Sequence, residues 1–148
     1  EEWEKNLRAQ EVILTQEMPQ DRRLKDVIIL TDDNFEELVY KDNAPWLIEF
    51  YAHGYILINL GGHCQRLAPE WAALATSMKG QVKIAKVDAT QTNKLFKFGV
   101  NGYPTIKYFP AGPKDDSSAE NYDGPRSESG MADWLREKTA ASGHFEHI

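Results

Sequence analysis

Short apolar runs recur along the chain at intervals, and each of them is typical of a buried β-strand. They cover residues 27–30, 46–51, 82–87 and 105–109, and a further short edge strand is predicted at 120–122. Continuous apolar runs of about four to eight residues are typical of strands covered on both faces. We therefore predict a sheet whose core includes the strands at 27–30, 46–51 and 82–87.

Between these runs the apolar residues change to helical spacing. Thr31 and the two aspartates after it form an N-cap signal, and Phe35, Leu38 and Val39 then follow at the spacing of one helix face. Similar apolar stripes predict helices over 64–78, 91–98 and 127–140. The predicted order is strand, helix, strand, helix, strand, helix, strand, strand, helix.

This order predicts the fold class. Alternating strands and helices require parallel strands joined by right-handed crossovers, whereas the last two strands are close in sequence and should pair antiparallel. We therefore expect an α/β fold with a mixed sheet of four or five strands and helices on both faces.

The length of 148 residues corresponds to about one domain. We place that domain at 27–141, after a helix and charged linker at 1–26 and before a tail at 142–148. Two interpretations of segment 1–26 stay open, namely the end of a preceding domain and an appendage of this one. The first residues lack the pattern of a signal peptide, as expected of a cytosolic protein or of a mature or excised piece.

Charge and composition exclude several classes of function. The chain has 17 Lys and Arg against 23 Asp and Glu, a net charge of −6, and no basic run, so we expect no nucleic-acid partner. Its longest near-continuous apolar stretch, 55–60, is far shorter than the roughly 20 residues of a membrane span. His144 and His147 have no third ligand nearby, so we expect no metal site, and we expect no cofactor. The single cysteine, Cys64, excludes a disulfide within this chain.

Chemically informative residues converge around Cys64. Residues 62–64 open a helix directly after a buried strand, and a helix N-terminus lowers the pKa of a thiol. Glu49 lies within the apolar run 46–51, where a carboxylate is costly unless it has a partner or a task. Lys86 is a second charge inside a core strand, and the two side chains could pair across neighbouring strands. Each could instead be an ordinary outward-facing residue, but both strands have the pattern of strands buried on both faces.

Five sequence blocks around these residues resemble the catalytic thioredoxin-like domain of the protein disulfide isomerases. The blocks are 50–52, 62–71, 86–90, 99–107 and 122–126, in the family's order, and the resemblance covers roughly 27–140. It implies a thioredoxin fold and thiol–disulfide exchange in oxidative protein folding. It also implies unfolded or disulfide-containing client proteins as partners, other domains of a longer chain, and a location in the lumen of the endoplasmic reticulum.

The resemblance implies a role for residues on the helix and the two strands. Cys64 matches the second, more buried cysteine of the family's Cys-Gly-His-Cys motif. His63 matches the histidine between the cysteines, which stabilises the attacking thiolate. Glu49 matches the buried carboxylate that relays a proton to the second cysteine, and Lys86 matches its charge partner.

Three further positions match the family's pattern nearer the carboxyl end. Arg126 matches a mobile arginine that tunes the second cysteine late in the reaction cycle. Pro104 matches the cis-proline that faces the active site, and Tyr103 is the residue before it. A cis bond in this turn leaves backbone groups free to pair with an extended substrate.

The segment 53–61 departs from the family. The family has Pro-Trp-Cys between Ala52 and Gly62, whereas this chain has nine residues, six more, and Gly61 stands where the nucleophilic cysteine is expected. Exchange requires an attacking thiol and a second thiol that resolves the mixed disulfide. The insert is either a natural loop or an irregularity of the gene. The chain is either an isomerase-type enzyme with impaired turnover, a redox-inactive, chaperone-like module that binds clients, or a spacer domain.

Overall fold

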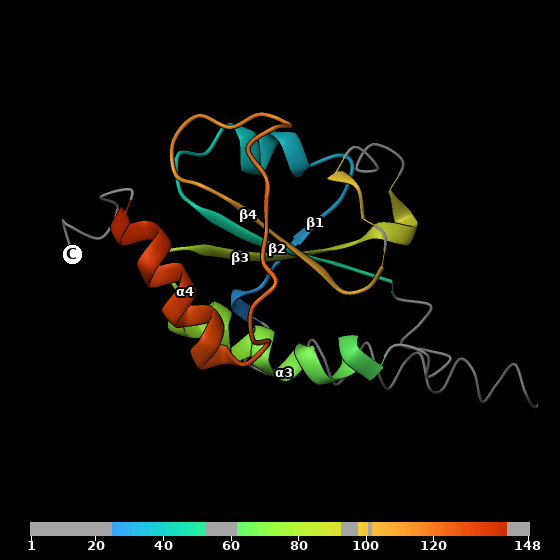
Figure 1. The fold of residues 1–148 in the computed structure, drawn as a ribbon. Coiled ribbons are helices and arrows are strands. Elements are labelled where there is room, and N and C mark those ends of the chain that lie inside the picture. The colour runs from blue at the N-terminus through green and yellow to red at the C-terminus, as the bar shows by residue number, and fades with distance from the viewer. Residues whose placement is uncertain (1–24, 53–61, 93–97, 101, 142–148) are drawn as a thin grey trace, which may run out of the picture.

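The helices and strands of the computed structural model follow the predicted order (Figure 1). The structure describes residues 25–52, 62–92, 98–100 and 102–141, and for 62–65 and 141 it describes the backbone alone. The strands are β1 (Ile28–Leu30), β2 (Trp46–Tyr51), β3 (Lys83–Asp88), β4 (Thr105–Phe109) and β5 (Glu120–Asn121). The helices are the π-helix η2 (Glu36–Tyr40), α3 (Gly62–Ser77), the 3-10 turn η3 (Ala89–Gln91) and α4 (Glu128–Ala141).

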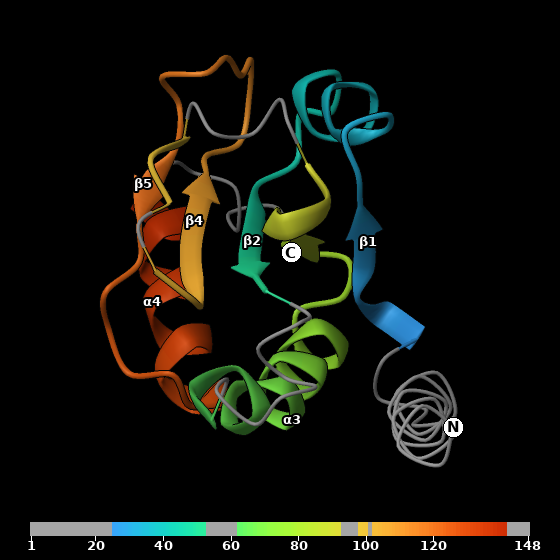
Figure 2. The same ribbon diagram turned by 90° about the vertical axis from the view of Figure 1, so that its right-hand side faces the viewer.

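The sheet has five strands in the order β1-β3-β2-β4-β5 (Figure 2). The strands β1, β3 and β2 are parallel, and β4 and β5 join as antiparallel neighbours. This arrangement confirms the predicted mixed sheet, and it places β2 and β3 at the centre, where both faces are covered.

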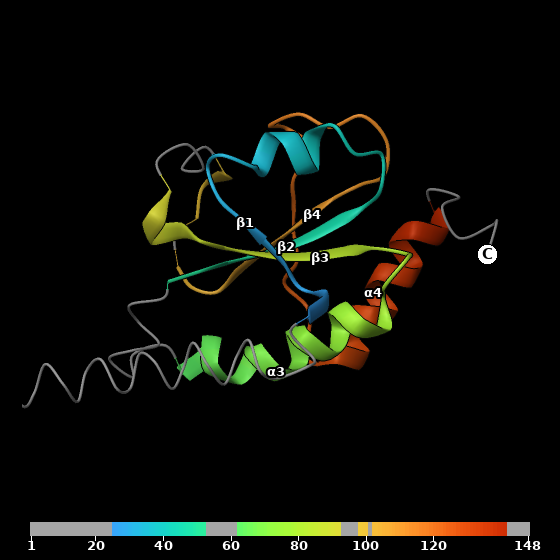
Figure 3. The same ribbon diagram turned by 180° about the vertical axis from the view of Figure 1, so that it is seen from behind.

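Helices cover both faces of the sheet, as predicted. The long helices α3 and α4 lie together on one face and η2 lies on the opposite face (Figures 1 and 3). Under α3 and α4, Trp71 and Leu135 pack among the buried apolar side chains of the sheet. The Trp71 indole N–H also donates to the carbonyl of Ala85 at 3.1 Å, which fixes α3 to β3. On the other face, an aromatic cluster that includes Phe50 and Phe98 fills the space beneath η2.

The expectation that the outer strand is buried on both faces is wrong for β1. Its central residue, Ile29, is 54% exposed among the described residues, because β1 lies at the edge of the sheet. The expectation is also wrong in part for β3, whose Lys83 is exposed and whose Lys86 is half-buried. Apolar composition predicts a strand here but does not predict its place in the sheet.

The first predicted helix begins later and has a different form. The Thr31 hydroxyl accepts a hydrogen bond from the Asp33 N–H, and the Asn34 side chain accepts from the Thr31 N–H, so these residues close a turn. The helix after them is a π-helix without a side-chain cap. Its wider turn buries Phe35 and Val39 but leaves Leu38 exposed, contrary to the predicted apolar face.

Several predictions lie outside the described residues. They are the helix within 1–26, residues 93–97 of the helix predicted at 91–98, and the tail at 142–148. Of the predicted helix 91–98, Gln91 closes the 3-10 turn η3, and Gly99 follows Phe98 with a positive φ of 66°.

Candidate active site

Glu49 lies at the centre of the sheet with Lys86 beside it. The parallel register places Glu49 of β2 opposite Lys86 of β3, and β1 and β4 continue this row with Ile29 and Ile106. Residues in one row of a sheet project to the same face. Ile106 belongs to the core beneath α3 and α4, so the carboxylate projects toward that layer. Glu49 is only 5% exposed, which confirms the expectation that this carboxylate is buried.

Burial dominates the titration of this pair. Removal from water raises the pKa of the Glu49 carboxyl to about 7, and the positive charges of Lys86 and Arg126 partly oppose the rise. Burial likewise lowers the pKa of the Lys86 ammonium, and the Glu49 charge opposes that change. A carboxyl with a pKa near neutral can both accept and donate a proton under physiological conditions. The pair therefore has the electrostatic properties that proton relay requires.

An aromatic ring takes part in the same cluster. The Lys86 ammonium lies 5.2 Å from the centre of the Tyr51 ring, within the range of a cation–π contact. Tyr51 is two residues after Glu49 on β2 and projects to the same face. We did not single out Tyr51 from the sequence. The sequence feature that indicates Tyr51 is an aromatic residue two positions after a buried charge on the same strand.

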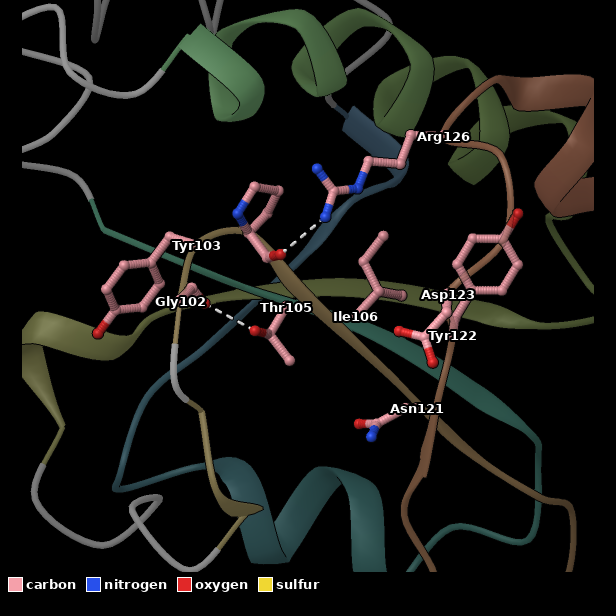
Figure 4. A pocket seen from close by; sticks show the side chains of 9 residues that line it. Gly102, Tyr103, Thr105, Ile106, Asn121, Tyr122, Asp123 and Arg126 are labelled. Atoms are coloured by element: carbon pink, nitrogen blue, oxygen red, sulfur yellow. Dashed lines mark hydrogen bonds between the residues drawn. The ribbon is translucent and has the colours of Figure 1, made fainter.

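A turn and a basic side chain complete the described part of the site. The Tyr103–Pro104 peptide bond is cis, as predicted. The Arg126 guanidinium donates through Nη2 to the Pro104 carbonyl oxygen at 3.2 Å (Figure 4). Arg126 comes from the segment just before α4, so its charge reaches the row at β2 from the opposite side to Lys86.

A pocket of about 400 Å³ opens beside Pro104. Its lining comes from the start of β4 and from the residues at the end of β5 and just after it, where the Tyr122 N–H donates to the Ile106 carbonyl at 2.9 Å. The side chains of Thr105, Asn121 and Asp123 bring polar atoms to this space (Figure 4).

For Cys64, the structure describes the backbone but not the thiol. Cys64 lies in the first turn of α3, which agrees with the predicted helix. The side chains of His63 and Cys64 lie outside the described residues, as does Gly61. The structure thus brings together Glu49, Lys86, Pro104 and Arg126, and the predicted roles of all these residues remain predictions.

The described residues include neither a candidate membrane span nor a candidate metal cluster. None of their helices is both long and apolar enough to cross a bilayer. The same part of the chain contains no cluster of three or more acidic, histidine or cysteine side chains that could hold a metal ion.

Comparison with protein families decides the relationship. The family model described as Thioredoxin matches residues 26–137, about three quarters of the chain. The chain belongs to the thioredoxin family. Solved structures agree: the first thioredoxin domain of mouse Protein disulfide-isomerase A4 is 35% identical, with a TM-score of 0.61, over 76% of this chain and 74% of that one. The Trx4 domain of ERdj5 is 29% identical, with a TM-score of 0.63, over 76% of this chain and 95% of that one.

Within the thioredoxin family the chain is similar to domains of the protein disulfide isomerases. It is 47% identical to the Protein disulfide-isomerase A6 homolog of Drosophila melanogaster, over 79% of this chain and 26% of that protein. It is 44% identical to human Protein disulfide-isomerase A6, over 71% of this chain and 23% of that protein. The chain thus spans about a quarter of the length of these curated relatives, and it is a thioredoxin domain of the protein disulfide isomerase type.

Proposed function

We propose that this domain acts in thiol–disulfide exchange on disulfide-containing client proteins during oxidative folding in the lumen of the endoplasmic reticulum. The observation that carries the proposal is the buried Glu49 carboxyl, whose pKa is raised to about 7 between the charges of Lys86 and Arg126. A scaffold without proton-transfer chemistry gains nothing from a carboxyl buried in the centre of its sheet, since such burial lowers stability. The resemblance to isomerase domains supports the same proposal.

The proposed chemistry begins with proton transfer from the Cys64 thiol to the Glu49 carboxylate. The resulting thiolate attacks one sulfur of a disulfide, a new sulfur–sulfur bond forms, and the displaced sulfur leaves as a thiolate. In a two-cysteine site this step resolves a mixed disulfide and releases the client. With Cys64 as the only cysteine of this sequence, attack on a client yields a mixed disulfide whose release requires a thiol from outside this sequence.

The test compares turnover of this chain with that of a repaired chain. Replacing residues 53–61 by Pro-Trp-Cys restores the second thiol two residues before His63. We expect the unrepaired chain to reduce insulin disulfides at the background rate and the repaired chain to turn over. Cys64→Ser in the repaired chain is the matched control and should abolish resolution. A repaired chain that folds but stays inert would contradict the enzymatic proposal.

A second function is favoured by the missing cysteine and by the pocket beside Pro104. In this alternative the domain binds unfolded clients without redox turnover. Its test is fluorescence anisotropy of a labelled, reduced and alkylated client with the Cys64→Ser chain. Saturable binding that Asn121→Ala and Asp123→Ala weaken supports the alternative, and binding indifferent to both substitutions speaks against it.

A further inference from the structure

The side chains of Glu49 and Lys86 form no ion pair in the described structure, although their backbone positions would allow one. The two residues are direct register partners on parallel strands, an arrangement that allows a close ion pair. Yet within the described residues no ion pair joins them, and their mutual influence is purely long-range attraction. The Lys86 ammonium is found instead over the Tyr51 ring, 5.2 Å from its centre.

Tyr51 is placed to compete for this ammonium. It lies at the end of β2, two residues beyond Glu49, so ring and carboxylate flank Lys86 on the same face of the sheet. A cation over an aromatic face gains electrostatic attraction without a counter-ion, and the gain increases as water is removed. The half-buried Lys86 ammonium can therefore interact with either the Glu49 carboxylate or the Tyr51 ring, and in the structure it lies over the ring.

We propose that Tyr51 is a positioning residue: its ring holds the Lys86 ammonium out of direct ion-pair contact with Glu49. An ion pair would favour the charged carboxylate and leave it a weak proton acceptor. With the ammonium over the ring, the carboxyl feels only attenuated positive charge from Lys86 on β3 and from Arg126 before α4. Asp88, the register partner of Tyr51, is two residues after Lys86 on β3 and adds a negative charge on the same face of the sheet.

This inference deepens the proposed function, because it concerns control of the proton carrier of that site. Its test follows titration instead of turnover, so it can fail while the thiol chemistry stands, and the reverse also holds. The measurement is the pH titration of the Glu49 side-chain carboxyl carbon by NMR in the full chain and its variants.

Tyr51→Leu removes the ring and keeps an apolar side chain. We expect the Glu49 pKa to fall by about one pH unit as Lys86 closes onto the carboxylate, since an opposite charge within a few ångströms has at least that effect. Tyr51→Phe is the matched control, because it keeps the aromatic face, and it should retain the Glu49 pKa of the unsubstituted chain. In a Lys86→Met background, Tyr51→Leu should produce no change, because the charge that the ring positions is gone.

An unchanged or raised Glu49 pKa in Tyr51→Leu would overturn the proposal, as would a Tyr51→Phe chain that behaves like Tyr51→Leu. A second measurement needs no substitution that could impair folding. In the unsubstituted chain the ring current of Tyr51 should shift the ε-protons of Lys86 upfield. Ordinary lysine shifts at that position would also overturn it.

Discussion

At the scale of single residues, the site depends on Glu49, a carboxyl side chain buried where a negative charge is unfavourable. Glu49 is buried among apolar neighbours, and the register places its compensating lysine on the next strand and not within its own segment. The raised pKa means that the folded chain holds a proton that the unfolded chain would release. This difference makes stability depend on pH in a direction that can be worked out.

Glu49→Gln should remove this pH dependence. The carboxyl has a pKa of about 7 when folded against 4.5 as its ordinary value, so its contribution is fully present below pH 4.5 and is lost as the pH rises through 7. At pH 8 the glutamine variant should be more stable by up to about 3 kcal/mol. The unpaired charge left on Lys86 reduces the gain. At pH 4, below the ordinary pKa of 4.5, the two chains should unfold nearly alike in urea, and a large gap that persists there would contradict the assignment.

Tyr108→Phe should stabilise the chain. Tyr108 is 1% exposed, and its hydroxyl has no hydrogen-bond partner within the described part of the chain. Its ring packs edge-on against Trp134 at 5.2 Å, a contact that phenylalanine preserves. Losing an unsatisfied buried hydroxyl is worth about 1 kcal/mol, measured as the free energy of unfolding in urea. Destabilisation would reveal that the hydroxyl has a partner.

At the scale of elements, a lysine in the long β4–β5 connection attaches that connection to the turn before β2. Lys114 is 9% exposed, and its ammonium donates to the carbonyls of Asp42 and Gly112. The Gly112 N–H donates to the Asn43 carbonyl at 2.8 Å, so this connection is fastened to the turn before β2. These hydrogen bonds therefore hold the turn before β2, the strand that carries Glu49, against the β4–β5 connection.

Lys114→Met should loosen this attachment and destabilise the fold by about 2 kcal/mol, because it leaves two carbonyls without their charged donor. The matched control is Lys41→Met. Lys41 pairs with Glu37 one turn earlier in η2, and both side chains are about two-thirds exposed, so its loss should change stability by no more than about 0.5 kcal/mol. Equal effects of the two substitutions, measured by urea unfolding, would contradict a special role for Lys114.

Sequence patterns predicted some elements closely and others poorly, for physical reasons. The strands at 46–51 and 105–109 each have a neighbouring strand on both sides, and their apolar runs coincide with their bounds. Ile29 shows the opposite case, since an edge strand can be apolar yet uncovered. The position of Lys86 beside Glu49 could be predicted because both charges interrupt core strands, whereas the ion pair that this position allows is not formed in the described structure. The contact of Lys86 with Tyr51 depends on a side-chain conformation that spacing does not encode.

At the scale of the whole molecule, an intact scaffold surrounds a segment that does not match the family. The described structure has the sheet, both long helices, the cis bond before Pro104 and the neighbouring charges of Glu49 and Lys86. The sequence departs from the family's pattern at residues 53–61. Residues 55–60 carry no charge and include two β-branched isoleucines. Sequences of this kind favour association between chains, against which the net charge of −6 provides general repulsion.

Ile58→Lys should therefore slow aggregation several-fold, because it places a charge within this apolar run. The measurement is light scattering at 37 °C with equal concentrations of folded protein. Gln91→Lys is the matched control, since it changes the net charge by the same amount at an exposed position outside the run. A lysine at position 91 lowers the net negative charge without interrupting an apolar segment, so it should not slow aggregation. If the two variants aggregate at the same rate, net charge and not segment 55–60 governs association of the molecule.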